Sequence, residues 1–234
     1  DLDNLKRHND EYTQRVKDAV HCFRDVSKLG DLEISQLTRE DQLDIAIDLN
    51  GYSQNNRISI FSNKLAPIQI NYLGFPGTLG ADSFDYIIAD KIIIPLENQE
   101  YFSEKILYMP NSFFPHDNTR QISSDEFSKE ELGLPSSGFV FTCFNAIYKI
   151  TRREFRIWCR LLQKIDGSVL WIIKPNTYAV ENLLNELNKY GLNKERLIFA
   201  EKMSLDKHLS SLSLGDLFLD TFNYNAGKTA TDAL

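Results

Sequence analysis

A lysine follows one of the apolar runs of the chain, at a position where it could bind an anion. The run covers residues 139–144, and Lys149 lies shortly after it, with Tyr148 directly before the lysine. Ligands of parallel sheets bind in the crevice outside the carboxyl ends of the strands, and a cation there is suited to phosphate or carboxylate oxygens. A solvated loop lysine is the alternative, and this segment alone leaves both open.

The last part of the chain, residues 220–232, offers a second candidate for an anion site. It follows an apolar run and opens a helical pattern, with Gly227, Lys228 and Thr229 at the junction. Phosphates bind at such junctions because the first N–H groups of a helix lack helical partners and carry positive potential. Asp232 lies one helical turn further on, where its carboxylate could accept hydrogen bonds from ribose hydroxyls. A plain helix cap with structural threonines is the alternative.

Glycines cluster in the segment 71–81, between two further apolar runs. Gly74 and Pro76 belong to a bend that directly follows the first of these runs. Glycine permits positive φ and lets another molecule approach the main chain closely, so the bend is a candidate ligand-binding edge. An ordinary tight turn is the alternative.

His208 lies near the amino end of a helical segment that begins after Ser204. A histidine in such a place more often packs against its neighbours or meets solvent than binds a ligand. The other histidines have no cysteine or carboxylate partners at metal-ligand spacing, so no metal site is predicted. No apolar run is followed by GxGxxG, which argues against a Rossmann dehydrogenase.

Short apolar runs that alternate with helical patterns are expected to position these residues. The expected strands cover 45–49, 68–73, 86–89, 105–108, 139–144, 169–173, 197–199 and 216–219. Most of them are continuously apolar, as strands covered on both faces of a parallel sheet are. The expected helices cover 153–164, 180–190 and 204–212. This alternation predicts an α/β architecture with parallel, doubly wound sheets.

Turn-forming residues, among them Pro115 and Asp117, separate the two sets of strands and indicate a boundary. The expected organisation is a first Rossmann-like lobe over 1–118, a linker over 119–137 and a second lobe over 138–234. The chain begins without Met, and its last helical pattern stops after a few residues. We therefore expect an internal piece of a longer protein, with both lobes incomplete.

The composition is that of a soluble globular chain, with 42% hydrophobic and 25% charged residues, and argues against disorder. The net charge of −7 and the lack of a basic stripe argue against nucleic acid as a partner. No apolar stretch is long enough to cross a membrane, and no membrane partner is expected. Cys22, Cys143 and Cys159 form no CxxC pair, so they are expected to be free thiols of a reducing, cytoplasmic compartment.

Several segments, in this order, resemble the catalytic region of the O-linked N-acetylglucosamine transferase family, including its bacterial SPINDLY-like branch. The resemblance rests on 47–52, 66–78, 85–90, 103–105, 108–114, 144–145, 148–149, 168–171, 219–221 and 232–234. It implies two facing Rossmann-like lobes of the GT-B type. It also implies inverting, metal-independent transfer of N-acetylglucosamine from UDP-GlcNAc to Ser or Thr of proteins or peptides. The nucleotide sugar is then a substrate, and no cofactor is expected. Family members usually carry tetratricopeptide repeats upstream.

The resemblance also implies roles for individual residues of the second lobe. Lys149 matches the lysine that holds the diphosphate of the donor, and Tyr148 matches its neighbour in the site. His208 matches the histidine that contacts the uridine, and Asp232 matches the carboxylate on the ribose. Thr229 matches a threonine at the diphosphate.

In the first lobe, Leu73, Gly74 and Pro76 match the bend that closes over the sugar. The reaction needs positively charged or N–H groups around the diphosphate, because negative charge gathers on the diphosphate as it departs. Without a metal, a lysine and backbone amides must stabilise that charge.

The chain departs from the family pattern at three places. Ala146 replaces a glutamine, Leu205 replaces a lysine that usually contacts the nucleotide, and the run 227–229 replaces His-Thr-Thr. Lys228 and its neighbour Gly227 belong to that run, and Lys228 could supply a positive charge there. Alternatives are therefore a related transferase that uses GDP-fucose or UDP-glucose, or a non-catalytic remnant of the family. The isolated fragment is expected to be inactive.

Overall fold

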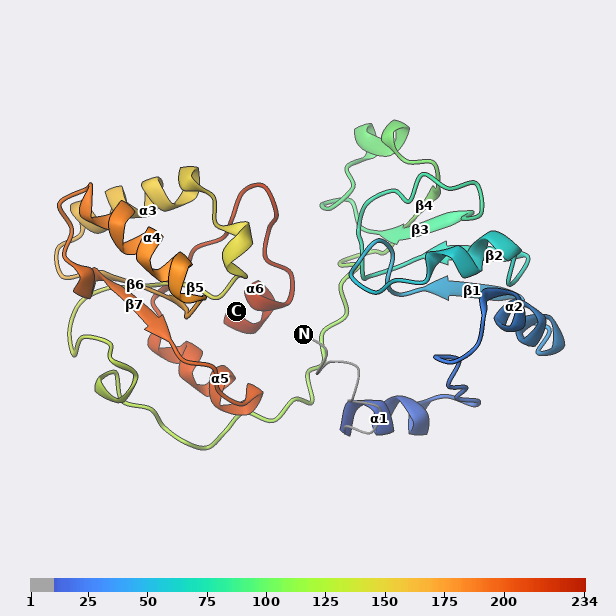
Figure 1. The fold of residues 1–234 in the computed structure, drawn as a ribbon, viewed down its shortest axis with the longest axis horizontal. Coiled ribbons are helices and arrows are strands. Elements are labelled where there is room, and N and C mark those ends of the chain that lie inside the picture. Colours follow the sequence, from blue (N-terminus) through green and yellow to red (C-terminus); the bar gives the residue numbers. More distant parts are fainter. Residues whose placement is uncertain (1–10) are drawn as a thin grey trace. The chain divides into compact units, whose positions relative to one another are not determined.

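The computed structural model describes residues 11–234 and divides the chain into two compact units, Asp1–Pro115 and His116–Leu234. Each unit contains a four-stranded sheet in which neighbouring strands are parallel (Figure 1). The expected α/β architecture is therefore confirmed. All the expected strands are present, with bounds within two residues of those predicted.

The first unit places its strands in chain order. Its helices are α1 (Glu11–Ala19) and α2 (Asp31–Glu40), and its strands are β1 (Ile45–Asp48), β2 (Ile68–Asn71), β3 (Tyr86–Ala89) and β4 (Lys105–Tyr108). The strand order is β1-β2-β3-β4. Because crossovers between parallel strands are right-handed, this order puts all the connections on one face of the sheet.

Burial follows from that topology. Ala46 of β1 is 7% exposed and belongs to a core with Phe61, Leu65 and Phe84. On the opposite face of the same strand, Ile45 and Ile47 are 50% and 47% exposed. The expectation of strands covered on both faces is therefore wrong for β1, whose residues alternate between buried and exposed.

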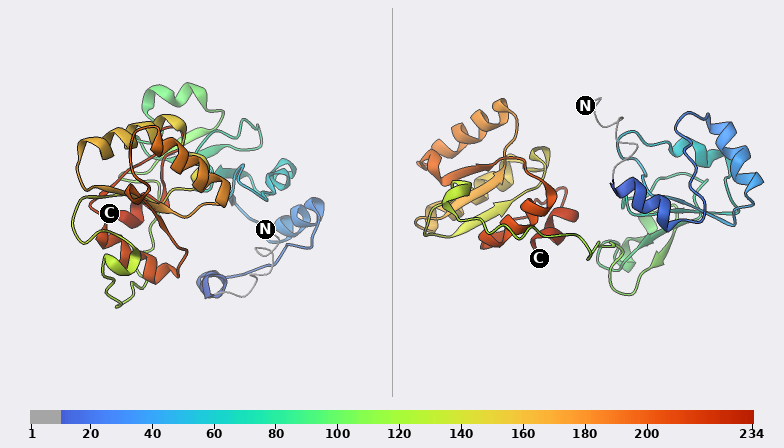
Figure 2. Two further views of the ribbon diagram at one scale, coloured as in Figure 1. Left: turned by 60° about the vertical axis from the view of Figure 1, so that its left-hand side comes forward. Right: turned by 90° about the horizontal axis from the view of Figure 1, so that it is seen from below.

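The second unit is doubly wound. Its elements are β5 (Val140–Cys143), α3 (Arg152–Lys164), β6 (Val169–Ile173), α4 (Thr177–Asn188), β7 (Leu197–Ala200), α5 (Leu205–Ser211), β8 (Leu217–Phe218) and α6 (Lys228–Ala233). Helices α3 and α4 cover one face of the sheet and α5 lies on the other (Figure 1; Figure 2). Here β5 and β6 are buried along almost their whole length, as expected for strands with two covered faces. Helix α4 begins earlier than predicted because the side chain of Asn176 caps it by accepting a hydrogen bond from Ala179 N.

The segment that we expected to be a linker, 119–137, packs within the second unit. Leu134 is 3% exposed and joins a core with Val140 and Trp171. The backbone N–H of Ser123 donates to the carbonyl of Asp206 at 3.1 Å. Within residues 11–234, no helix is both long and apolar enough to cross a membrane.

The three cysteines are free, and two of them are inaccessible. Burial raises the pKa of Cys143 to about 11 and that of Cys159 to about 11, so neither carries a thiolate near neutral pH. Cys22 is exposed. We expect a disulfide reagent at pH 8 to titrate Cys22 rapidly in the native protein, and the other two only after denaturation. A Cys22→Ser variant should then show no fast thiol, and fast reaction of Cys143 or Cys159 would contradict the buried packing.

Candidate functional site

The strand order of the second sheet creates a switch point between β5 and β8. From β5 the chain winds outward through β6 to β7, and it then returns to the other side of β5 with β8, giving the order β7-β6-β5-β8. Ligands of doubly wound sheets bind at the carboxyl ends of the strands where the winding reverses. Residues 144–149 follow β5 and residues 219–227 follow β8, so the fold brings both candidate segments of this unit to that place.

Lys149 reaches across from the β5 side to the loop that follows β8. Its Nζ donates to the carbonyl of Asn225 at 3.3 Å and lies 4.1 Å from the centre of the Tyr224 ring, within the range of a cation–π contact. Partial burial lowers the pKa of Lys149 from its ordinary value, against the opposing field of the Asp220 carboxylate. The ammonium is thus held in place while still partly exposed.

Asp220 organises the loop that Lys149 contacts. One carboxylate oxygen accepts from the backbone N–H groups of Thr221 and Ala226, each at 2.7 Å, and from Asn145 Nδ2 at 3.1 Å. The other accepts from Asn225 Nδ2 at 3.3 Å. Hydrogen bonds to a carboxylate are stronger than neutral ones, so this single side chain fixes the path of the loop beside the lysine.

Asn145 connects β5, the loop and α6. It is 1% exposed, and its Nδ2 also donates to Thr221 Oγ1 at 3.0 Å. Its Oδ1 accepts from the hydroxyl of Thr229 at 2.7 Å, which ties the first turn of α6 to the end of β5. Helix α6 has only six residues, so its dipole is small, and Lys149 is the stronger source of positive potential.

His208 and Asp232, which the resemblance assigns to the nucleoside, also lie near each other. The His208 ring packs edge-on against Phe144, with centroids 4.9 Å apart. Burial lowers the pKa of His208, and the negative charge of Asp232 opposes that effect. Asp232 itself forms an ion pair with Arg120, with 2.5 Å between Nη2 and Oδ1, a partner that the sequence did not suggest.

Two predicted residues stay outside this cluster. Tyr148 is 78% exposed, although it adjoins Lys149 in the chain. Lys228 is exposed at the first position of α6. Gly227 precedes it, and its carbonyl accepts the N–H groups of Ala230 and Thr231 at 3.1 and 3.2 Å. Among residues 11–234, no group of three potential ligand side chains is placed to hold a metal ion.

The predicted bend of the first unit is a strained turn at the carboxyl end of β2. Leu73 has a φ of 72°, a left-handed conformation that is costly for a branched residue. Asn71, fully buried, donates from Nδ2 to the carbonyl of Gly77 at 3.1 Å. Glu104, 3% exposed, accepts from Leu79 N at 2.7 Å. Two buried side chains, Asn71 and Glu104, therefore hold the bend that contains Pro76 by hydrogen bonds to its backbone.

Gly74 has no room for a side chain. A Cβ there would lie 2.4 Å from the carbonyl oxygen of Leu49 and 2.8 Å from the Cα of Asn50. We expect Gly74→Ala to lower the free energy of unfolding by about 3 kcal/mol, since backbone atoms must move. Gly80→Ala is the control: nothing lies within 4 Å but φ is +62°, so about 1 kcal/mol is expected. Equal losses in urea denaturation would contradict the clash at Gly74.

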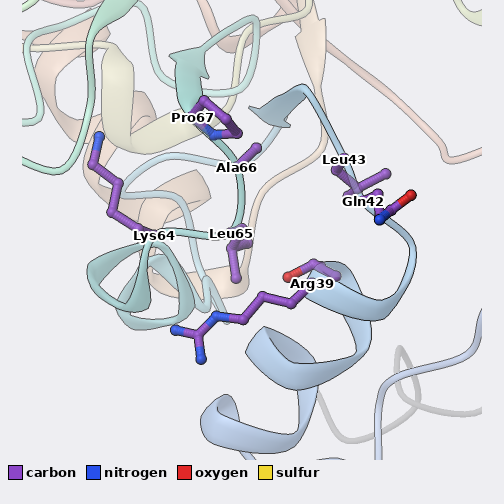
Figure 3. Close-up of a pocket in the computed structure, with 8 residues that line it drawn as sticks. Arg39, Gln42, Leu43, Lys64, Leu65, Ala66 and Pro67 are labelled. Atoms are coloured by element: carbon purple, nitrogen blue, oxygen red, sulfur yellow. The ribbon is translucent and has the colours of Figure 1, made fainter.

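A hollow of about 340 Å³ lies at the other edge of the first sheet (Figure 3). It is lined by Leu43, just before β1, and by Ala66 and Pro67, just before β2, so it opens at the amino ends of the strands. Its lysine, Lys64, lies 3.4 Å from the carboxylate of Asp85. The hollow contains none of the predicted site residues.

Comparison with known proteins identifies the class to which this fold and site belong. The chain matches the glycosyl transferase family 41 over residues 6–126 and 121–234. It therefore belongs to glycosyltransferase family 41, and the expected family is confirmed.

Among its relatives are two plant proteins named as probable UDP-N-acetylglucosamine–peptide N-acetylglucosaminyltransferases. SEC of Arabidopsis thaliana is 33% identical over 97% of this chain, and SPINDLY of Solanum lycopersicum is 31% identical over 95%. The chain spans 24% of the length of each. Activity, substrates and partners of the whole protein are therefore proposed below.

Solved structures agree on the fold. A variant of the O-GlcNAc transferase of Thermobaculum terrenum superposes with a TM-score of 0.84 and 25% identity, over 96% of this chain and 42% of that one. HepE of Anabaena, solved with UDP and glucose, gives a TM-score of 0.53 and 12% identity, over 96% of this chain and 68% of that one. At that identity HepE supports the fold alone.

Proposed function

We propose that the protein containing this chain is an inverting glycosyltransferase that moves N-acetylglucosamine from UDP-GlcNAc to Ser or Thr hydroxyls of proteins. The observation that carries the proposal is the position of Lys149. Its ammonium lies at the switch point of the second sheet, against a loop that a carboxylate holds in place. A diphosphate bound there would meet a fixed positive charge.

In the proposed reaction, the acceptor oxygen forms a bond to the anomeric carbon from the side opposite the diphosphate. The bond from that carbon to the phosphate oxygen breaks, and UDP departs with the electron pair. Lys149 stabilises the charge that gathers on the diphosphate. Thr229 donates its hydroxyl hydrogen to Asn145 Oδ1, so it would have to exchange that bond to donate to the diphosphate. The proton of the acceptor hydroxyl goes to a base that we do not assign.

The nucleoside is assigned to the neighbouring pair of residues. Because burial lowers its pKa, His208 is neutral near pH 7 and can offer one ring nitrogen as donor and the other as acceptor to uracil. Asp232 accepts the ribose hydroxyls. The role of the bend of Leu73, Gly74 and Pro76 at the sugar stays a prediction from the resemblance alone.

The names of the plant relatives support a UDP-N-acetylglucosamine donor and a peptide acceptor. Two sequence departures keep other donors, GDP-fucose or UDP-glucose, as a second candidate. Leu205 lies at the first position of α5, one turn before His208, where it offers the nucleotide no charge. Ala146 offers no amide beside Lys149. A non-catalytic remnant of the family is the remaining candidate.

Two measurements test the proposal. Thermal unfolding of the chain with UDP should show stabilisation that GDP does not give, of about 2.7 kcal/mol when the ligand is at a hundred times its dissociation constant. The full-length protein should transfer radiolabelled sugar from UDP-GlcNAc to members of a peptide library. Stabilisation by GDP alone would favour a GDP-sugar donor, and nucleotide binding without transfer from any donor would favour a remnant.

A further inference from the structure

The ion pair of Arg120 and Asp232 is buried and joins residues far apart in the chain. The two side chains are 9% and 6% exposed, and Arg120 Nη2 lies 2.5 Å from Asp232 Oδ1. A buried ion pair loses its hydration and often adds little to stability. Its presence at the nucleoside end of the proposed site therefore suggests a role other than holding the fold together.

Arg120 is itself held in place by the segment around it. Its Nε donates to the carbonyl of Asp117 at 3.3 Å, and its Nη2 lies 2.5 Å from His116 Nε2. The hydroxyl and the backbone N–H of Thr119 both donate to the Asp117 carboxylate. These local bonds present the planar guanidinium in a fixed direction, and such a preorganised arginine positions a carboxylate well.

Asp232, by contrast, lies on the short helix α6. The described contact with Arg120 uses Oδ1, so Oδ2 is left to accept another donor. A buried carboxylate without a cationic partner is costly and tends to turn toward water. A carboxylate that has turned away no longer accepts a hydrogen bond from a hydroxyl group bound at the site.

We propose that Arg120 is a positioning residue of the nucleotide site: it directs the carboxylate of Asp232 so that Oδ2 accepts the ribose hydroxyls of the donor. This inference rests on the proposed function, because it concerns the same nucleotide. It adds a residue that neither the sequence motifs nor the resemblance pointed to. Arg120 acts through Asp232 and need not contact the ligand.

The test compares nucleotides with and without ribose hydroxyls. In the full-length protein, isothermal titration should show UDP bound at least about tenfold more tightly than 2′,3′-dideoxy-UDP, since a hydrogen bond to a charged group carries that much discrimination. In Arg120→Met this preference should largely disappear through weaker UDP binding, while the dideoxy analogue binds as before. A merely structural role would weaken both ligands equally, and that result would overturn the inference.

Further variants are needed in case Arg120→Met does not fold, and they are chosen by the charge that each one leaves at the ion pair. Arg120→Met leaves the carboxylate of Asp232 buried alone and can destabilise the unit. Arg120→Lys keeps a positive charge but removes the planar guanidinium with its several N–H donors. The double variant Arg120→Met with Asp232→Asn removes both charges. Both should stay folded by circular dichroism and show a reduced preference for UDP over the dideoxy analogue. Arg156→Met, which removes an exposed arginine paired with Glu186, should keep the full preference.

The outcomes separate this inference from the proposed function. If the native protein binds UDP without regard to the ribose hydroxyls, the inference fails while the uridine donor stands. If it binds GDP but not UDP, the proposed donor fails, and the same comparison with 2′,3′-dideoxy-GDP tests Arg120. If it binds neither nucleotide, both fail. An unchanged preference in folded Arg120→Met or Arg120→Lys also overturns the inference.

Discussion

Replacing Lys149 with alanine is expected to lower turnover of the full-length protein by about a hundredfold or more while leaving it folded. A preorganised group that stabilises developing charge lowers the barrier by about 3 kcal/mol, and this ammonium lies at the switch point in contact with the 220–227 loop. The side chain is partly exposed, so its loss leaves no deep cavity. Turnover, measured as labelled sugar transferred to peptide, should fall mainly through kcat.

Lys174 provides the matched control. It follows β6 as Lys149 follows β5, but it lies one strand away from the switch point and pairs with Glu201. Lys174→Ala should keep normal turnover. If both variants behave alike, or if Lys149→Ala keeps near-normal turnover, the diphosphate assignment is wrong.

The pH profile provides a further measurement on the same residue. Partial burial lowers the pKa of Lys149 from its ordinary value of 10.5. Since the protonated form binds the diphosphate, activity should be full below the lowered pKa and decline as the pH rises through it. The alkaline limb should therefore begin at a lower pH than a solvated lysine would give. Lys149→Arg, which stays charged throughout, should lose that limb in whatever activity it retains.

The sequence predicted the strands well because each one is marked locally. A strand such as β6 is a short apolar run bounded by polar residues, and such a run needs no knowledge of its neighbours to be recognised. What covers a strand depends on the order of strands in the sheet. Ile45 and Ile47 therefore look like core residues in the sequence, although the connections of the first sheet lie on the other face and leave them exposed.

The same distinction applies to the site. Lys149 and Thr229 could be singled out because each follows a strand end or begins a helix, which is a local signal. Asp220 also follows a strand end, but the sequence did not assign it a role, because its importance comes from hydrogen bonds to both ends of a loop and to Asn145. Arg120 lay in a segment expected to be a linker, and only the folded chain brings it to Asp232. A polar residue directly after an apolar run, as Asn145 is after 139–144, is the sequence feature most worth testing for a role in holding site loops.

Asp220→Ala is expected to lower both stability and turnover. The change removes the acceptor for two backbone N–H groups at 2.7 Å and for two asparagine side chains. At about 1.5 kcal/mol or more for each of the shorter bonds to a charged group, the free energy of unfolding should fall by about 3 kcal/mol. The freed loop would no longer hold Asn225 beside Lys149. Displacements of about 1 Å near the reacting groups can cost about a hundredfold in rate.

Asp216 separates these two effects, because it lies at the opposite end of the same strand. Its carboxylate accepts one backbone N–H, that of Val140, at 2.8 Å, and it precedes β8 whereas Asp220 follows it. Asp216→Ala should therefore cost about 1.5 kcal/mol in urea denaturation with turnover unchanged at a temperature where the variant is folded. Asp220→Ala should lose turnover even there. Normal turnover in folded Asp220→Ala would mean that the loop finds its working position without this carboxylate, and that Lys149 needs no support from it.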